Sequence, residues 1–392
     1  MEFRQRISTF LATIQQLVFP AVETALEAPL TATHQRLIRI LELVQVERAI
    51  PPSQPAPWGG RPPADRRKLA RAYLAKAALG LSETADLRHQ LTVDRTLRRL
   101  CGWEEGEALP SLATFSRAFA DFATQRVCDL RHVALVREHL GDTITAHLCY
   151  DTTAIPVRER VAKVIPAPAS TEPPVRRKRG GRRTEAAPPP EPTRLQRQQT
   201  QTMTEMLQDL PMACAVGCKQ NSQGNKEYWT GYKLHVVQTD DGVPVAAFTT
   251  GANVHDSQGA IPLLRLARGR GVRACYDLMD SAYDAKEIRA VATRLGHMPI
   301  IDANRRRTES KAERERLARL SCSRLSVDRA LVDGDRRRRF AARTAVERFN
   351  SDLKDNCGAR LIRVRGSAKV HALLMCGLLV IFAEAILAFG SG

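Results

Sequence analysis

Acidic residues are scarce relative to basic ones in this chain. Its 392 residues include 42 Asp and Glu against 60 Lys and Arg, which gives a formal net charge of +18 and a pI near 10. Such a charge favours a polyanionic partner. Nucleic acid is the leading candidate, and an anionic membrane surface is the weaker one.

The sequence also lacks a regular cysteine spacing. Nine cysteines are scattered along the chain, and the close pair Cys214 and Cys218 has no second pair at zinc-finger spacing. An odd, irregular set fits reduced thiols in a cytoplasmic protein better than a disulfide framework or a structural zinc site. The first 20 residues mix acidic and basic side chains and lack a small-residue cleavage site, so they do not indicate a signal peptide.

One apolar stretch, residues 370–389, is long enough to raise the question of a membrane span. It contains His371 and Glu384 and lacks a flanking aromatic belt. We therefore expect a buried helix that covers a sheet, and no membrane.

Composition divides the chain into four parts. We expect an N-terminal helical segment at 1–50, a Pro-rich linker at 51–64, a second helical region at 65–142, and an α/β region at 143–392. The short basic helices of 65–142 are compatible with DNA binding and equally with a plain bundle.

A Pro-rich, basic insert at about 163–203 is poor in apolar residues, so we expect it to be disordered. Its cluster of Arg176, Arg177, Lys178 and Arg179 either binds the phosphate backbone or is a solvated linker.

Strand and helix patterns alternate in the α/β region. Strand-like runs at 147–155 and 228–252 are followed by a helix at 256–267, a strand at 272–280, a helix at 285–295 and a strand at 298–302. Asp241-Gly242 predicts a hairpin inside the second run. The order predicts a mixed sheet with flanking helices, compatible with a ribonuclease-H-like fold but not selected by pattern alone.

Three carboxylates stand out. Asp151 and Asp280 each end an apolar strand run, and Asp277 competes with Asp280 but falls on the opposite face of its strand. In a helix, Phe340, Arg343, Glu347 and Lys354 lie within roughly 60° of one another. The stripe is either a solvated, salt-bridged face or a carboxylate set between cations at a Mg²⁺-dependent nucleic-acid site.

The spacing Phe340-x2-Arg343-x3-Glu347-x6-Lys354 resembles the tyrosine-x2-arginine-x3-glutamate-x6-lysine signature of a branch of DDE transposases of bacterial insertion sequences. Phe replaces the signature Tyr, so the ring remains and its hydroxyl is lost. DTTAI at Asp151 and MDSAYDAKEI at Asp280 are similar to the family's two aspartate segments. Residues 228–235 and 251–257 resemble segments between them.

The resemblance implies an all-α N-terminal region followed by a ribonuclease-H-like catalytic domain. It implies a catalytic, metal-binding triad of Asp151, Asp280 and Glu347, with Mg²⁺ (or Mn²⁺) as the metal, expected as two ions. It further implies that Arg343 and Lys354 contact double-stranded DNA at the transposon end, and that the enzyme cleaves DNA and joins 3′-OH ends to a target. Joining two ends requires a homodimer or larger assembly in a synapse, located in the bacterial cytoplasm at the nucleoid.

Several other residues keep two interpretations. Lys233 is a candidate phosphate contact, and Arg363 and Arg365 either track the DNA backbone or remain solvated. His235 and His255 favour structural roles over metal binding, and Trp229 and Tyr232 favour packing in the sheet over base stacking. Two other functions stay open: a metal-dependent nuclease without strand transfer, and a non-catalytic DNA-binding derivative.

Overall fold

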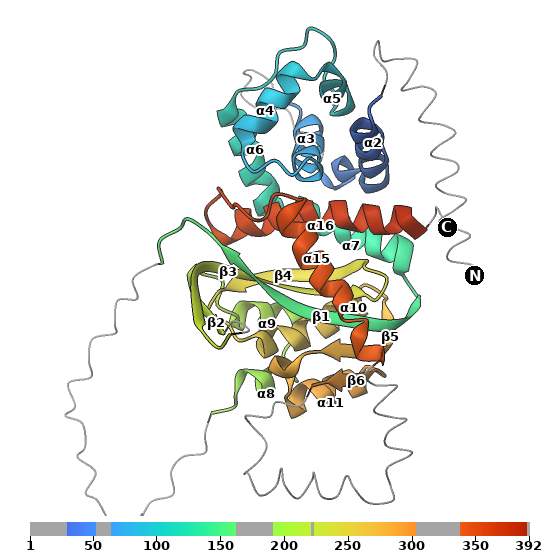
Figure 1. The fold of residues 1–392 in the computed structure, drawn as a ribbon, viewed down its shortest axis with the longest axis vertical. Helices are drawn as coiled ribbons and strands as arrows, with labels where there is room; N and C mark the ends of the chain where they lie inside the picture. Colours follow the sequence, from blue (N-terminus) through green and yellow to red (C-terminus); the bar gives the residue numbers. More distant parts are fainter. Residues whose placement is uncertain (1–29, 52–63, 162–190, 221–222, 303–337, 390–392) are drawn as a thin grey trace, which may run out of the picture.

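A computed structural model describes residues 30–51, 64–161, 191–220, 223–302 and 338–389. Within these ranges a helical layer lies above a sheet, and one long helix, α16, lies between the two (Figure 1). Three predicted parts lie wholly or partly outside the described residues. They are residues 1–29 of the predicted N-terminal segment 1–50, residues 52–63 of the predicted linker 51–64, and most of the basic insert, including Arg176, Arg177, Lys178 and Arg179.

The upper layer consists of helices alone, as predicted for the N-terminal half. They are α2 (Ala32–Val44), η1 (Val46–Ala49), α3 (Arg66–Ala78), α4 (Thr84–Val93), α5 (Arg95–Leu100), α6 (Leu112–Gln125) and α7 (Val127–Leu140). Ser111 caps α6, since its side chain accepts the Thr114 N–H. Tyr73 packs against Phe115 and Phe119 at the centre of this layer.

The lower layer is a mixed sheet. Its strands are β1 (Ile144–Pro156), β2 (Ala215–Gln220), β3 (Lys226–Thr239), β4 (Pro244–Gly251), β5 (Arg273–Met279) and β6 (Met298–Ile301). The spatial order is β2-β3-β1-β5-β6, with β4 also paired to β3. β1, β3 and β4 pair antiparallel, whereas β1-β5 and β5-β6 are parallel. These antiparallel and parallel pairings confirm the predicted mixed sheet. The hairpin predicted at Asp241-Gly242 is also present and joins β3 to β4.

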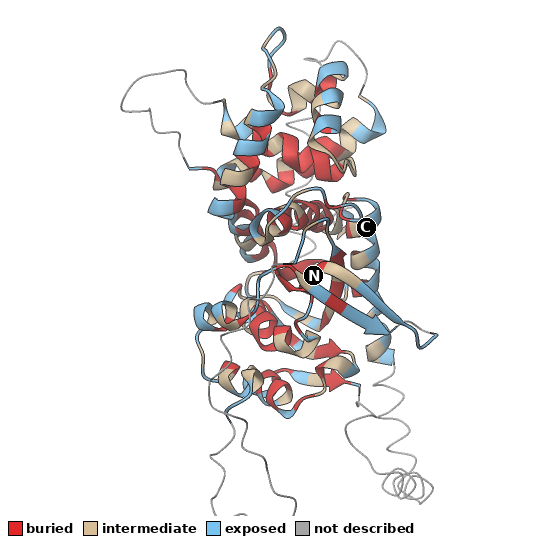
Figure 2. Cartoon of the chain, turned by 90° about the vertical axis from the view of Figure 1, so that its left-hand side faces the viewer, coloured by how far each residue is buried: buried red, intermediate tan, exposed pale blue. Residues whose placement is uncertain are grey.

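Shorter helices cover the sheet and its connections. They are α8 (Arg194–Gln198), α9 (Met203–Asp209), η2 (Asp256–Gly259), α10 (Ala260–Gly269), η3 (Ser281–Tyr283), α11 (Lys286–Arg294) and α15 (Thr344–Asp355). α10 packs on β3 and β4, and α15 packs on β1 and β3. The β2–β3 end of the sheet projects beyond the buried body and is largely exposed (Figure 2).

The long apolar helix α16 (Ser367–Phe389) contacts α2, α3, α6 and α7 on one side and β4 on the other. Within the described ranges it is the helix long and apolar enough to cross a membrane, and 72% of its apolar window is buried inside the protein. Burial between two layers accounts for its composition. The predicted buried helix is present, although it covers the helical layer as well as the sheet.

Three predicted boundaries differ from the structure. The end of the insert is ordered: a capping box between Thr193 and Gln196 starts α8, which packs near α10 and α11. β1 continues past Asp151, because β3 pairs with it as far as Pro156. The predicted stripe of Phe340, Arg343, Glu347 and Lys354 does not lie on one helix, since residues 342–343 form a turn before α15 begins at Thr344.

Candidate active site

Two parallel strands bring Asp151 and Asp280 to one level of the sheet. The register of β1 and β5 pairs Cys149 with Leu278, so the residues two positions further along, Asp151 and Asp280, are neighbours. Asp280 follows β5 and caps η3, where its Oδ1 accepts the Ala282 N–H at 2.8 Å. Asp151 therefore marks the end of the pairing with β5 rather than the end of its own strand.

Helix α15 supplies the third carboxylate. Its buried face, which includes Val346, Phe349 and Leu353, packs toward the sheet and α16. Glu347 lies on another face, with a side chain that is 60% exposed. The amphipathic spacing of α15 thus leaves Glu347 off the buried face, on the side where Arg343 links it to Asp151 and Asp280.

The Arg343 guanidinium lies between the three carboxylates. Its Nη2 is 3.4 Å from Asp151 Oδ1 and 3.7 Å from Asp280 Oδ2, and its Nη1 is 3.5 Å from Glu347 Oε1. Its Cζ lies 5.8 Å from the centroid of the Phe340 ring. This cation–π contact needs no ring hydroxyl, so it tolerates Phe in place of Tyr. A single cation therefore offsets the mutual repulsion of three carboxylates.

Two further side chains of α15 reach β1 beside Arg343. Asn350 Nδ2 donates to Asp151 Oδ2 at 2.7 Å, and Lys354 Nζ donates to Thr153 Oγ1 at 2.6 Å. Asn350 Oδ1 is buried and has no hydrogen-bond partner. Sequence reasoning missed Asn350, although its position three residues after Glu347 puts both on neighbouring helical positions.

Burial controls the titration of this cluster. It raises the pKa of Asp151 to about 6, while Arg343 opposes the rise. Burial also raises the pKa of Asp280, again against Arg343, and lowers the pKa of the Lys354 ammonium. Raised carboxyl pKa values mean that the ionised forms are poorly compensated, so a further cation at this place would be favourable.

A fourth carboxylate lies nearby. Asp256, at the start of η2, contributes to the raised pKa of both Asp151 and Asp280. Lys233 Nζ donates to Asp256 Oδ1 at 2.7 Å and to the Val254 carbonyl at 2.9 Å. The predicted phosphate contact Lys233 is therefore engaged inside the protein, and its side chain is 13% exposed. Sequence analysis did not single out Asp256, although it lies in the 251–257 segment.

A hydrogen-bond chain supports the opposite face of β1. Thr152 Oγ1 lies 2.8 Å from the Tyr283 hydroxyl and 3.0 Å from His235 Nδ1, and His235 Nε2 lies 2.9 Å from Thr250 Oγ1. His235 is buried, and burial lowers its pKa to about 4, so the ring is neutral at pH 7. Its contacts are those of a structural residue. His255, the other candidate, accepts the Ser257 N–H at the start of η2.

The competing aspartate, Asp277, lies in the core. Its carboxylate accepts a hydrogen bond from the Tyr150 hydroxyl at 3.0 Å and lies 3.0 Å from His297 Nδ1. It is fully buried. The alternation of β5 therefore separates Asp277 from Asp280, and the contacts with Tyr150 and His297 satisfy the buried carboxyl group of Asp277.

The remaining predicted residues are spread around the site. Arg363 pairs with Glu83 at 3.3 Å, and both Arg363 and Arg365 are exposed. Tyr232 is buried in the sheet and donates to Glu159. Trp229 of β3 pairs with Gly217 of β2, and its indole covers the glycine so closely that a Cβ there would lie 2.3 Å from the ring. The rings of Trp229 and Tyr232 therefore both pack in the sheet.

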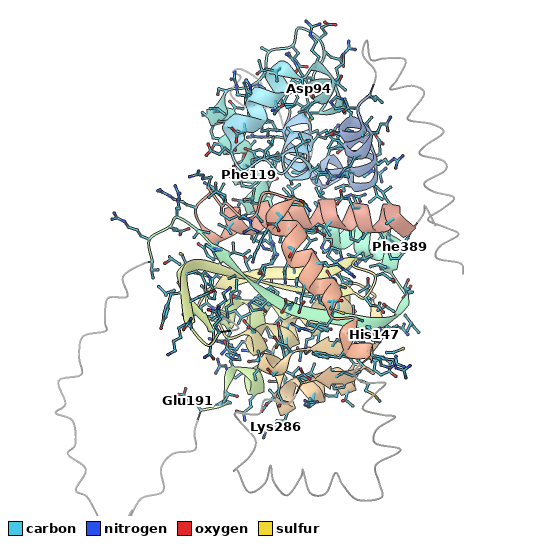
Figure 3. All side chains as sticks on the ribbon, in the orientation of Figure 1. Asp94, Phe119, His147, Glu191, Lys286 and Phe389 are labelled. Atoms are coloured by element: carbon cyan, nitrogen blue, oxygen red, sulfur yellow. The ribbon has the colours of Figure 1, made fainter. Side chains whose placement is uncertain are left out.

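The chain before α15 adds a stacked group at the other end of β1. The Arg339 guanidinium lies 4.2 Å from the Tyr276 ring centroid, and the His147 ring stacks on the same tyrosine. His147 Nδ1 lies 2.6 Å from Asp240 Oδ2. Figure 3 labels His147 in the lower, sheet-containing part of the molecule. The segment that leads into α15 is thus packed against β1 and β5.

The oxygen donors at the carboxylates suit a divalent cation. Within the described ranges, neither this site nor any other place has three His, Cys, Asp or Glu side chains arranged to bind an ion as they stand. At Asp151, Asp280 and Glu347 the Arg343 guanidinium fills the space between the acids. Carboxylate and amide oxygens are preferred Mg²⁺ ligands, and the unpartnered Asn350 Oδ1 adds one to the set. These residues fit such an ion once Arg343 moves.

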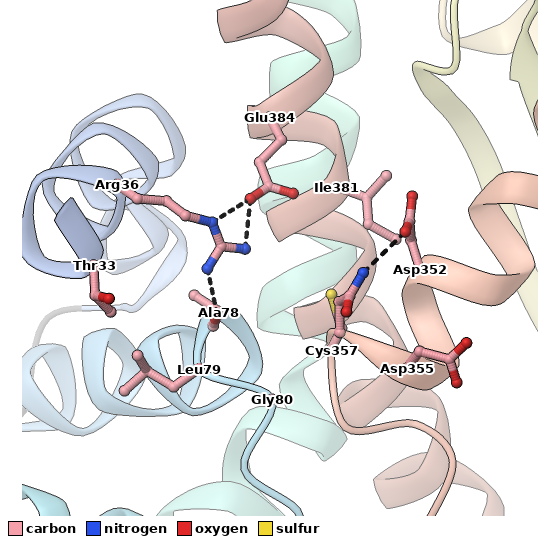
Figure 4. Close-up of a pocket in the computed structure, with 11 residues that line it drawn as sticks. Thr33, Arg36, Ala78, Leu79, Gly80, Asp352, Asp355, Cys357, Ile381 and Glu384 are labelled. Atoms are coloured by element: carbon pink, nitrogen blue, oxygen red, sulfur yellow. Dashed lines mark hydrogen bonds and ion pairs between the residues drawn. The ribbon is translucent and has the colours of Figure 1, made fainter.

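A cavity of about 580 Å³ lies at the far end of α15, beside α2 and α16 (Figure 4). Arg36 crosses it, donating to Glu384 at 2.6 Å and to the Ala78 carbonyl at 2.6 Å. Asp352 and Asp355 line it, but none of the three central carboxylates does. It belongs to the joint between the helical layer and α15 rather than to the carboxylate site.

Comparisons with known proteins agree with this arrangement. A family described as "Transposase DDE domain" matches residues 193–383, which include Asp280 and Glu347, and "Transposase domain (DUF772)" matches residues 25–121. A probable transposase for insertion sequence element ISH11, from two strains of Halobacterium salinarum, is 29% identical over 146 residues.

That alignment covers 37% of this chain and 43% of the relative, so it spans less than half of the relative's length. No solved structure matches the chain. The first match covers β2 to β6, α15 and most of α16, and the second covers α2 to most of α6; residues 122–192, which include α7, β1 and Asp151, lie outside both. Both matched domains are transposase domains, and together with the relative they support a DDE transposase of insertion sequences.

Proposed function

We propose that this protein binds the ends of an insertion sequence, cleaves DNA there and joins the freed 3′-OH ends to target DNA by metal-dependent phosphoryl transfer. The observation that carries the proposal is the convergence of Asp151, Asp280 and Glu347 on one guanidinium. Carboxylates held this close need positive charge, and phosphoryl transfer uses such charge directly.

The strand order supports a ribonuclease-H-like fold for the catalytic part. Without β2, the order is β4-β3-β1-β5-β6, with an antiparallel meander followed by two parallel strands joined through helices. The acidic helix α15 then packs back on β1. We propose residues 143–392 as this domain and residues 65–142 as the DNA-recognition region, with α16 packed between them.

Each residue of the site has a proposed role. Asp151, Asp280 and Glu347 would hold Mg²⁺ or Mn²⁺, as two ions, which supply activation of the attacking oxygen and stabilisation of the leaving oxygen. Asn350 fixes one oxygen of Asp151 and leaves the other facing Arg343. Arg343, once released from the acids, is free to contact a phosphate of the substrate.

Contacts to DNA extend beyond the acids. We propose that Arg343, Lys354, Arg363 and Arg365 face the DNA backbone, and that Lys233 acts from the edge of the site while it holds Asp256. The full DNA-bound assembly is proposed to contain at least two subunits, because two transposon ends must be joined together. It would act where the chromosome lies, at the nucleoid in the cytoplasm.

A strand-transfer assay tests the proposal. The purified protein is incubated with a labelled duplex carrying the element's own end, a target plasmid, and Mg²⁺ or Mn²⁺. Joined product in the wild type, lost in Glu347→Gln while duplex binding persists, is the expected result. Cleaved but unjoined DNA would instead indicate a nuclease, and binding without metal-dependent chemistry would indicate a non-catalytic derivative.

A further inference from the structure

Two segments that are distant in sequence run side by side at the far end of β1. Val157 forms a parallel bridge with Ile362, which lies in the loop between α15 and α16. Figure 1 shows this loop beside the upper end of β1. Two extended chain segments therefore lie next to each other, one leaving the sheet and one entering α16.

The contacts of Glu159 fix this pair of segments. Its Oε2 accepts the Gly366 N–H at 2.9 Å and the Tyr232 hydroxyl at 3.1 Å. Gly366 has a φ of +89°, a conformation that favours glycine and turns the chain into α16. One carboxylate thus ties the end of β1 to the second segment and to β3.

Four exposed arginines lie on these two segments. Arg158 and Arg160 flank the half-buried Glu159, and Arg363 and Arg365 flank the half-buried Val364; all four arginines are exposed. We name Arg158, Arg160, Arg363 and Arg365 the arginine ribbon. Arg363 pairs with Glu83 on the helical layer, whereas no ion pair is recorded for the other three within the described ranges.

We propose that the arginine ribbon binds the phosphate backbone of duplex DNA that extends from the carboxylate site; this rests on the proposed function. Three exposed guanidinium groups without acidic partners, on a chain of net charge +18, are complementary to a polyanion. The guanidinium fork also matches phosphate oxygens in geometry.

The spacing supports a duplex that reaches both places. Arg158 follows Asp151 by seven residues of extended chain, which is about 23 Å at about 3.3 Å per residue. That length corresponds to about seven base pairs of duplex. A duplex with its reacting phosphate at the carboxylates would therefore pass the arginine ribbon within its first helical turn.

The test compares two variants with the same loss of charge. The first carries Arg158→Gln, Arg160→Gln and Arg365→Gln, and it leaves the Arg363–Glu83 pair intact. The control carries Arg137→Gln, Arg268→Gln and Arg273→Gln, three exposed arginines near the opposite end of β1 and β5. Binding to a labelled random-sequence duplex about three turns long is measured across a salt series, without divalent metal.

The proposal expects the ribbon variant to lower the slope of log K against log salt by about 2 to 3, since each lost phosphate contact removes about 0.9. Affinity should fall at least about tenfold, and only about twofold in the control. Thermal unfolding verifies that both variants fold. Equal losses in the two variants, an unchanged ribbon variant, or tighter binding of a single strand than of the duplex would overturn the proposal.

The two proposals fail separately. Asp280→Asn should bind this duplex as the wild type does, while losing cleavage. If the wild type binds through the arginine ribbon but never cuts DNA with Mg²⁺ or Mn²⁺, the catalytic proposal fails and the ribbon stands. If the wild type cuts and joins DNA while the ribbon variant binds normally, the ribbon fails and the catalytic proposal stands.

Discussion

Replacing Arg343 with Ala should tighten divalent-metal binding even though the residue belongs to the site. The Arg343 guanidinium lies within 4 Å of Asp151, Asp280 and Glu347. A cation that binds between these acids must displace it. The wild-type affinity for metal is therefore reduced by the free energy of the contacts that Arg343 gives up.

The size of the effect follows from burial. Side-chain exposure is 16% at Asp151 and 34% at Asp280, against 60% at Glu347. Partly shielded ion pairs contribute about 1 kcal/mol each, and exposed ones close to nothing. Losing the two shielded pairs costs about 2 kcal/mol, so Arg343→Ala should bind metal about 30-fold more tightly.

Isothermal titration with Mn²⁺, in the absence of DNA, measures this directly. A pH of about 8 keeps Asp151 ionised, since its pKa is about 6 and rises further when Arg343 is removed. Arg348→Ala is the matched control, because Arg348 is exposed on α15 and its replacement removes the same charge close to the site. Unchanged or weaker metal binding in Arg343→Ala, or an equal gain in Arg348→Ala, would refute the idea that bound metal displaces Arg343 from the carboxylates.

Three further outcomes follow from the same contacts. The pKa of Asp151 is raised to about 6, so between pH about 4 and 6 the folded protein keeps a proton on Asp151 that the unfolded chain has lost. Without added metal, the free energy of unfolding should therefore fall by about 3 kcal/mol as pH rises through that window. Urea titrations of Asp151→Asn should not show this fall. Gly259→Ala places a Cβ 2.3 Å from His235 Nδ1 and should destabilise by about 1–3 kcal/mol, whereas Gly269→Ala meets nothing within 4 Å and should be near neutral in the same denaturation assay. Asn350→Ala removes the donor to Asp151 and should weaken Mn²⁺ binding about tenfold or more by titration; unchanged binding would mean that the hydrogen bond does not position the carboxylate.

Local pattern was sufficient for the strands that carry the aspartates. The apolar runs before Asp151 and Asp280 indicated strands, and the alternation of helices and strands after the hairpin indicated a mixed sheet, although it did not say which strands are parallel. Alternation also separated Asp277 from Asp280, because successive side chains point to opposite faces. These inferences need only periodicity and the order of elements.

Tertiary contacts decided what pattern could not. The extension of β1 depends on β3, and the turn at 342–343 that starts α15 has no distinctive residue to announce it. The contacts of Asn350 and Lys233 depend on which strand each faces. The helix α8 formed in a stretch of disorder-like composition because capping and packing act together.

The long apolar helix could be predicted in part. Length and hydropathy alone fit a membrane span as well as a core helix, whereas His371, Glu384 and the lack of an aromatic belt favoured the core helix. Its burial between the helical layer and β4 distinguishes them, and that burial depends on residues distant in the sequence.

Anomalous diffraction from Mn²⁺ bound to the protein together with its DNA end tests the central claim most directly. The account predicts Mn²⁺ between Asp151 and Asp280, with Glu347 turned toward it and the Arg343 guanidinium moved away from the acids. An active complex that holds its Mn²⁺ elsewhere, with Arg343 still between the three carboxylates, would contradict the account.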